Sequence, residues 1–430
     1  MRSAKLSLSA VLPKATQISG VELNGVIQRG SRLAEITRLI QKRLQIPTKT
    51  VFKTNPQASA TPFFRDELHG FNTMSVDVTS YTTHPVLYRL ENRAERVACE
   101  QAMRHRKGEV VDTLEEQLVE WLVTQTPALR RQPDALAQAI TAKIGREGWE
   151  AYGTWAWFPW RQTWVRLLPE EAFVAVRTNR NRNKITSEEQ ERLASKCVGI
   201  AGLSVGSALA TTLAMERSCG KLKLADFDVL ELSNLNRIQT GVHHLGIPKA
   251  VATARAIAEV DPYLEVELFL EGFTAENAEV FMKGVDFVCD ACDQVKAKAN
   301  LRWHAKANGI PLIMETSDRG MIDIERYDEA DTPLLHGRIS DDMLMEMRNA
   351  SAWRPEFFDA FIDISQASER GVASLQAVGT TLVGWPQLFT DVAAGGAHAA
   401  QIIRSIFLGE HVPDARHYLE WNEQLLESVN

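Results

Sequence analysis

The chain has 430 residues, enough for two or three domains, and with 45% hydrophobic and 24% charged residues it has the composition of an ordinary globular protein. Its formal net charge of −7 argues against a general nucleic-acid binder, although a small anionic ligand responds only to local charge. The apolar runs are shorter than a membrane span, and the five irregularly spaced cysteines argue against a disulfide framework, so we expect a protein of the reducing cytoplasm with no membrane partner.

Residues 1–61 are expected to form an N-terminal arm. The stretch 32–44 carries apolar side chains at helical spacing, and Pro47 ends it. Residues 48–61 have the composition of a linker, and the basic, serine-containing start lacks the apolar segment of a signal peptide. We expect this region to pack as an extension on the rest of the chain or on a partner.

Residues 62–176 are expected to form a mainly helical accessory domain with a tryptophan-rich β-layer. Residues 114–126 and 134–144 have helical periodicity. The stretch 155–168 alternates as a β-hairpin does, with Pro159 near its bend. The tryptophan rings here either form the core of a small β-layer or provide an aromatic platform for an extended peptide.

The stretch that follows predicts a nucleotide-binding βαβ unit. Residues 197–201 form a short apolar run that ends at Gly202, a small-residue helix follows, and a second apolar run ends in Asp226, about 20 residues after the glycine. Such a turn offers backbone N–H groups and a helix N-terminus to a phosphate, and the acid can bind ribose hydroxyls. The turn has Ser204 and Ser207 where a dinucleotide motif has its second and third glycines, and Gly206 stands between them.

Strands and helices then alternate regularly, which predicts an α/β fold with a doubly wound, Rossmann-like parallel sheet. Apolar runs occur at 197–201, 222–225, 265–270, 285–289 and 310–314, with helical stretches at 207–219, 249–259, 275–283 and 294–308. Ligands in such sheets bind at the C-terminal strand ends, where the sequence places Asp226, Asp228, Asp290, Asp293, Glu315 and Asp318. Further strands at 320–327 and 416–421 predict an antiparallel C-terminal extension, with helical segments at 341–361 and within 384–409.

Motifs beyond the turn resemble the ThiF/MoeB-like adenylating family, which includes the ubiquitin-activating enzymes. They are Asp226-Phe227-Asp228, Ser233-Asn234-Leu235-Asn236-Arg237, Pro248-Lys249 and Asp290-Ala291-Cys292-Asp293-Gln294. They are similar to the family's D-x-D, S-N-L-x-R, P-K and D-x-x-D-N, with Gln294 where Asn is usual. The resemblance covers residues 177–430, identifies them as the adenylation domain, and implies ATP-dependent adenylation of a carboxylate with release of pyrophosphate.

The resemblance also implies roles for individual residues. Asp226 would bind the ribose, Arg237 and Lys249 the phosphates, and Asp293 the Mg²⁺. The other implied ATP contacts are Gly202, Ser204, Gly206, Asp228 and Asn234. In the family, an arginine-containing segment ahead of the first strand reaches across a homodimer to the phosphates. Arg180 and Arg182 are the candidates here, although four cations in eight residues are also typical of a solvated arm.

Several alternatives stay open. Asp293 could merely cap the following helix, and Arg237 could pair with Asp228. No cysteine follows Cys292, so we expect neither a thioester nor a zinc site, and an amine, amide or thiol would attack the acyl-adenylate. The activated carboxylate could belong to a small acid, a peptide or a ubiquitin-like protein. Other functions are an NAD(P)-linked oxidoreductase, which has no need of the implied phosphate and metal residues, and a catalytically silent scaffold.

Overall fold

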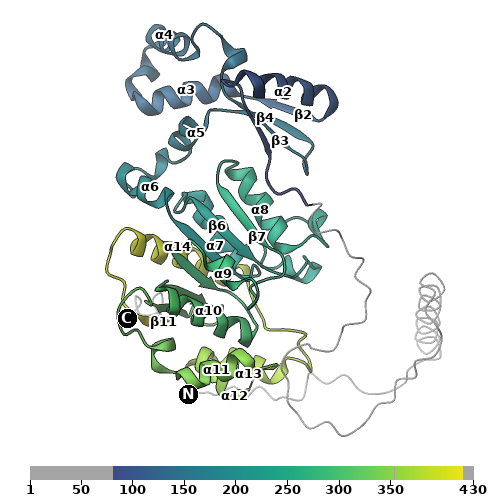
Figure 1. The fold of residues 1–430 in the computed structure, drawn as a ribbon, viewed down its shortest axis with the longest axis vertical. Coiled ribbons are helices and arrows are strands. Elements are labelled where there is room, and N and C mark those ends of the chain that lie inside the picture. The colour runs from purple at the N-terminus through teal and green to yellow at the C-terminus, as the bar shows by residue number, and fades with distance from the viewer. Residues whose placement is uncertain (1–80, 353, 420–430) are drawn as a thin grey trace, which may run out of the picture. The chain divides into compact units, whose positions relative to one another are not determined.

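The structure is a computed structural model that describes residues 81–352 and 354–419 (Figure 1). The expected arm at 1–61, its helix at 32–44 and the first part of the accessory domain lie outside the described residues. Among the described helices, none combines the length and the apolar character needed to cross a membrane.

The N-terminal part of the described chain is a four-stranded sheet with helices packed around it. Its strands β1 (Val86–Arg89), β2 (Glu109–Asp112), β3 (Thr154–Phe158) and β4 (Thr163–Leu167) lie in the order β1-β3-β4-β2. Its helices are α2 (Arg93–His105), α3 (Leu114–Gln125), α4 (Pro133–Ile144) and α5 (Glu170–Arg177). The predicted hairpin is confirmed as the antiparallel pair β3–β4, and the two predicted helices are confirmed as α3 and α4.

The tryptophans of the hairpin form the core of this layer. Trp157 and Trp164 are paired across β3 and β4, their ring centroids are 5.0 Å apart, and only 1% of Trp164 is exposed. Tyr88 on β1 completes the cluster, 5.8 Å from the Trp164 ring. Rings that are already packed on one another cannot stack on a peptide, so the core interpretation holds for these two tryptophans.

The second sheet confirms the predicted fold class. Its seven strands lie in the order β11-β10-β9-β8-β5-β6-β7. The parallel strands are β5 (Cys197–Ala201), β6 (Lys221–Ala225), β7 (Glu265–Phe269), β8 (Phe287–Asp290) and β9 (Leu312–Glu315). The strands β10 (Ile322–Glu325) and β11 (Ala415–His417) extend it in antiparallel fashion, as predicted, while residues 420 and 421 of the expected last strand lie outside the described residues.

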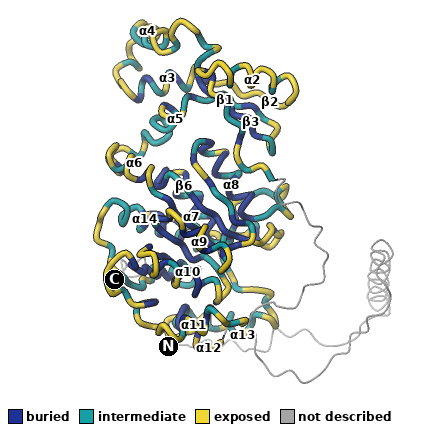
Figure 2. Tube along the Cα trace, viewed as in Figure 1, coloured by how far each residue is buried: buried dark blue, intermediate teal, exposed yellow. Residues whose placement is uncertain are grey.

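Two apolar layers sandwich this sheet because its strands alternate between faces with period 2. Val198 and Ile200 of β5 pack toward α7 (Gly206–Glu216), α8 (Lys249–Val260) and α14 (Phe389–Phe407). Cys197 and Ala201 face the layer formed by α9 (Ala278–Met282), α10 (Val295–Asn308), α11 (Asp341–Asn349) and α12 (Pro355–Ile362). The central strands are accordingly buried throughout (Figure 2).

The helical region predicted at 341–361 is two helices rather than one. Pro355 begins α12 because proline has no N–H to donate and fits the first turn of a helix. A further helix, α13 (Glu369–Ala377), lies between α12 and α14. From β5 the chain adds β6 and β7 on one side of the sheet, and it then returns to add β8 and β9 on the other side of β5. Sheets of this kind bind ligands at such a switch point, so the site is expected in the crevice at the C-terminal ends of β5 and β8.

Candidate functional site

The turn after β5 is built for close approach of the backbone. Gly202 has φ of +92°, and a Cβ there would overlap the carbonyl oxygen of Ala291 at the end of β8. Only glycine combines this conformation with this contact. Helix α7 then begins at Gly206, and no side chain caps its first turn, so N–H groups of that turn are available to an anion.

Asp226, directly after β6, connects the end of that strand to the turn through hydrogen bonds. Its Oδ2 accepts a hydrogen bond from the Leu203 N–H (2.6 Å) and its Oδ1 from the Asp228 N–H (2.8 Å), and the residue is only 7% exposed. Burial raises the pKa of Asp226, and the opposing effect of Lys249 does not fully offset it. A carboxylate has about four lone-pair sites, so about two remain for hydroxyl donors such as those of a ribose.

The two cations expected at the phosphates both lie at this edge of the sheet. The Arg237 Nε donates to Ser204 Oγ in the turn (2.9 Å), and its Nη1 donates to the Ser233 carbonyl (3.1 Å). The Nζ of Lys249, whose side chain is 7% exposed, is 2.6 Å from Asp228 Oδ2. The sequence left open whether Arg237 pairs with Asp228. In the structure the partner of Asp228 is Lys249, and Arg237 contacts Ser204 and Ser233 instead.

Asp293 follows β8, one residue ahead of Gln294, which is the N-cap of α10. It is therefore not the N-cap residue that the alternative interpretation requires. Desolvation first, and then repulsion from Asp228, raises the pKa of Asp293, so the two carboxylates are close enough to interact. A divalent cation would relieve that repulsion, and Mg²⁺ is bound by one or two carboxylates together with phosphate oxygens. This pair fits Mg²⁺; groups of three or more metal-binding side chains are absent from the described residues.

Three expected residues have mainly structural contacts or lie elsewhere. Asn234 is buried in the crossover after β6, where its Oδ1 accepts from the Glu231 N–H (2.9 Å). Arg180 and Arg182 are exposed, and Asn181 between them donates to the Glu216 carbonyl at the far end of α7 (2.9 Å). An 11-residue helix is about 16 Å long, so within one chain these arginines are not brought to the turn.

Charged groups that the sequence did not single out lie behind the site. Arg302 on α10, fully buried, donates to Asp290 Oδ2 (2.6 Å) and is 2.9 Å from Glu325 Oε1. Burial opposes ionisation of Asp290, but Lys298 and Arg302 outweigh it and lower its pKa. The only sequence signal was the i, i+4 spacing of Lys298 and Arg302 on one helix face.

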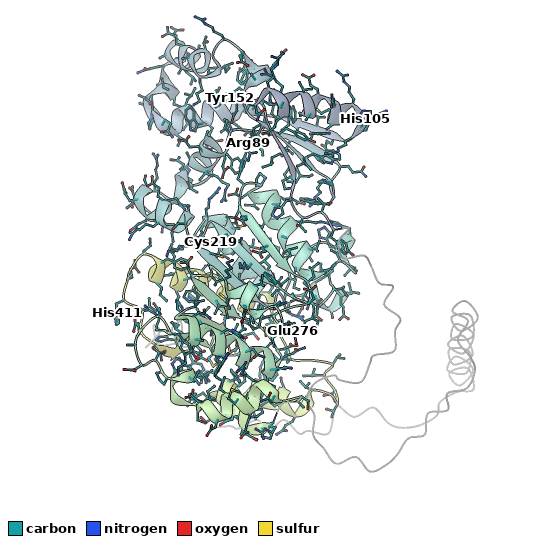
Figure 3. All side chains as sticks on the ribbon, viewed as in Figure 1. Arg89, His105, Tyr152, Cys219, Glu276 and His411 are labelled. Carbon is teal, nitrogen blue, oxygen red and sulfur yellow. The ribbon has the colours of Figure 1, made fainter. Side chains whose placement is uncertain are left out.

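His336 and the cysteines are not among the expected site residues. The Nδ1 of His336 is 2.6 Å from Asp414 and its Nε2 is 3.1 Å from Asp323. All five cysteines are unpaired thiols, and Cys289 is buried at the end of β8. Cys219, labelled in Figure 3, is fully buried. Burial raises the pKa of Cys289, Cys292 and Cys219, which keeps them protonated and poorly nucleophilic.

Known proteins are similar to part of the chain. Residues 178–349 match the model of the ThiF family. The uncharacterized protein MT1398 of Mycobacterium tuberculosis is 45% identical over 266 residues, which are 61% of this chain and 37% of that protein. A tRNA threonylcarbamoyladenosine dehydratase of Bacillus subtilis is 31% identical over 161 residues, 37% of this chain and 63% of the relative. The adenylyltransferase and sulfurtransferase MOCS3 of Dictyostelium discoideum is 34% identical over 118 residues, 27% of each chain. The chain thus spans less than two thirds of each of these relatives.

Proposed function

From the premise that the chain carries a ThiF family domain at residues 178–349, we propose that it binds ATP at the C-terminal ends of β5 and β8 and adenylates a carboxylate. The product is an acyl-adenylate, and pyrophosphate is released. The observation that carries this proposal is the contact of Arg237 with Ser204, which holds a guanidinium on the turn at the start of α7.

The charge of the site favours a triphosphate over a dinucleotide. Arg237 and Lys249 are two cations beside one helix N-terminus, and the facing carboxylates of Asp228 and Asp293 add a place for a metal ion. A dinucleotide pyrophosphate has fewer charges to neutralise and no need of a metal. The second observation that supports ATP is therefore this acid pair at the mouth of the crevice.

The residues would change partners when the nucleotide enters. Lys249 would leave Asp228 for a phosphate oxygen, and Asp228 would then be free to join Asp293 at the metal. Asp226 would hold the ribose while keeping the turn in place. The attacking carboxylate oxygen then displaces pyrophosphate from the α-phosphorus, and no protein nucleophile is required, because positioning and charge stabilisation supply the catalysis. The metal, when bound, neutralises phosphate charge.

We further propose a homodimer in which Arg180 and Arg182 of one copy reach the phosphates of the other. Both side chains are exposed, and they lie about one helix length from the turn between β5 and α7 of the same chain. Subunit complementation tests this. A mixture of the Arg180→Ala/Arg182→Ala variant with Lys249→Ala should regain part of the activity that each lacks alone, and a mixture as inactive as its components would contradict the trans role.

ATP–pyrophosphate exchange tests the adenylation itself, with small acids and peptides as candidate carboxylates. Exchange should fall by about two orders of magnitude or more in Arg237→Ala and in Lys249→Ala. Lys306→Ala is the matched control, because Lys306 is an exposed lysine of α10 whose ion pair with Asp341 spans 4.0 Å. Equal losses in all three variants would refute a specific role. The unpaired thiols fit the reducing cytoplasm that we propose as the compartment.

A further inference from the structure

A carboxylate without a partner lies beside the nucleotide crevice. Glu315 ends β9, next to β8 in the sheet, and its Oε1 is buried and makes no hydrogen bond to any of the described residues. Buried polar atoms are hydrogen-bonded in the great majority of cases, so an orphan of this kind requires an explanation. The other acids at the strand ends have partners: Asp226 has two N–H donors and Asp290 has two cations.

Glu315 lines a small cavity that borders the proposed phosphate site. The cavity has a volume of about 20 Å³ as space for water centres, and its walls include Gly206 and Leu209 of α7, Asp290 at the end of β8 and Ala291 after it, and Gly396 of α14. About 10–15 Å³ by this measure holds one water molecule, so the cavity admits one group of that size. Gly206 starts the helix whose N-terminus faces the crevice, which makes the cavity an immediate neighbour of that site.

Two glycines of α14 create the space that the carboxylate occupies. A Cβ on Gly395 would overlap the Glu315 carboxylate, and a Cβ on Gly396 would lie 2.8 Å from the Leu209 backbone N. Glycine in the middle of a helix lowers the stability of the helix relative to alanine. The consecutive pair therefore has a packing reason, and the result is a close α7–α14 contact with a carboxylate enclosed beneath it.

The electrostatic surroundings of Glu315 favour a cation. Burial, and then the negative charge of Asp391, raise the pKa of Glu315 to about 8. The pKa of Asp391 is itself raised, by burial and then by Asp318. Asp290, which also lines the cavity, engages the cations Lys298 and Arg302. A water-sized cation that donates hydrogen bonds is an ammonium group, and a carboxylate ligand would be repelled.

We propose that Glu315 binds the primary ammonium group of the acyl acceptor, so that the product of the enzyme is an amide. The inference rests on the proposed adenylation, which would place the acyl-adenylate at the adjoining crevice. The bound ammonium gives one proton to the Glu315 carboxylate. The free amine nitrogen then attacks the acyl carbon, the bond from that carbon to the phosphate oxygen breaks, AMP leaves with the electron pair, and the second nitrogen proton passes to solvent. A carboxylate of ordinary pKa is too weak a base for the first transfer, since amines such as that of lysine have pKa values of about 10.4.

Calorimetry at pH 9 with methylammonium and n-propylammonium chloride, on the full chain saturated with ATP, tests this binding, because Glu315 is then ionised while both amines are still protonated. Both ions should bind the wild type, and tetramethylammonium, which has no N–H, should not. Glu315→Gln should lower the affinity for the primary ammonium ions by about tenfold or more, which is the loss expected for one hydrogen bond between charged groups. Glu315→Asp keeps the charge and shortens the side chain, so its affinity for these ions should lie between those of the wild type and Glu315→Gln. Glu410→Gln, an exposed acid after α14, is the matched control and should bind as the wild type does.

The outcomes separate this inference from the proposed function. ATP affinity is measured first and should be equal in the wild type and in Glu315→Gln, which also shows that the variant is folded. Failure of the wild type to bind ATP would refute the adenylation proposal. ATP binding together with primary ammonium affinity that is absent, or equal in the wild type and Glu315→Gln, would overturn the role of Glu315 alone.

Discussion

Replacing Glu315 by Gln should change how the stability of the protein depends on pH. The ordinary pKa of 4.5 rises to about 8 in the folded protein. Between these values the unfolded chain loses its proton and the folded protein keeps it, so the free energy of unfolding falls as pH rises from 4.5 to 8 and stays low above 8. At about 1.4 kcal/mol per pKa unit, the loss amounts to about 5 kcal/mol.

Glu315→Gln removes this ionisation and replaces it with a neutral amide. The amide is also unpaired in the cavity, which costs about 1–3 kcal/mol at every pH. The variant should thus be slightly less stable than the wild type at pH 5 and a few kcal/mol more stable at pH 9. Urea unfolding followed by tryptophan fluorescence at both pH values measures this, with Glu410→Gln as the control. A difference between variant and wild type that is the same at pH 5 and pH 9 would refute a buried, unpaired carboxylate.

Three further outcomes follow from the structure. Asp293→Asn should retain ATP binding and lose about 100-fold or more of the pyrophosphate exchange, since the metal would lack a ligand; exchange within a few-fold of the wild type would remove Asp293 from the reaction. Arg302→Met should lower the free energy of unfolding by about 3–5 kcal/mol, because Asp290 and Glu325 lose a buried partner, and an unchanged urea midpoint would contradict this. Replacement of all five cysteines by Ser or Ala should leave exchange intact in a folded protein, so a collapse of exchange would reveal a catalytic thiol.

The fold was predictable because its signal is local. Each parallel strand is a short apolar run bounded by a turn, and each intervening helix has its own periodicity, so β5 to β9 and α7 to α10 appear at the expected places. Pro355 marks the start of α12 and so indicates a break in the helical region 341–361. The sequence alone does not distinguish two separate helices from one bent helix at that point. The resemblance to the family's motifs likewise pointed to Arg237 and Lys249, and both side chains lie at this edge of the sheet.

The parts of the site that could not be predicted depend on contacts between distant segments. The pairing of Lys249 with Asp228 is set by how α8 lies against the end of β6. Glu315 was recognised as a strand-end acid, but its isolation results from Gly395, which lies on a helix at the other end of the domain sequence. His336 gains both of its partners from strand and loop residues brought together by β10 and β11.

The most direct test of ATP binding at this site is calorimetric titration of the full chain with ATP and Mg²⁺, beside an identical titration with NAD. ATP should bind and NAD should not compete with it. Arg237→Ala should lower the affinity for ATP by about tenfold or more, as expected when a hydrogen-bonded cation at a phosphate is lost. A preference for NAD, or ATP binding that does not respond to Arg237→Ala, would contradict adenylation at the turn between β5 and α7.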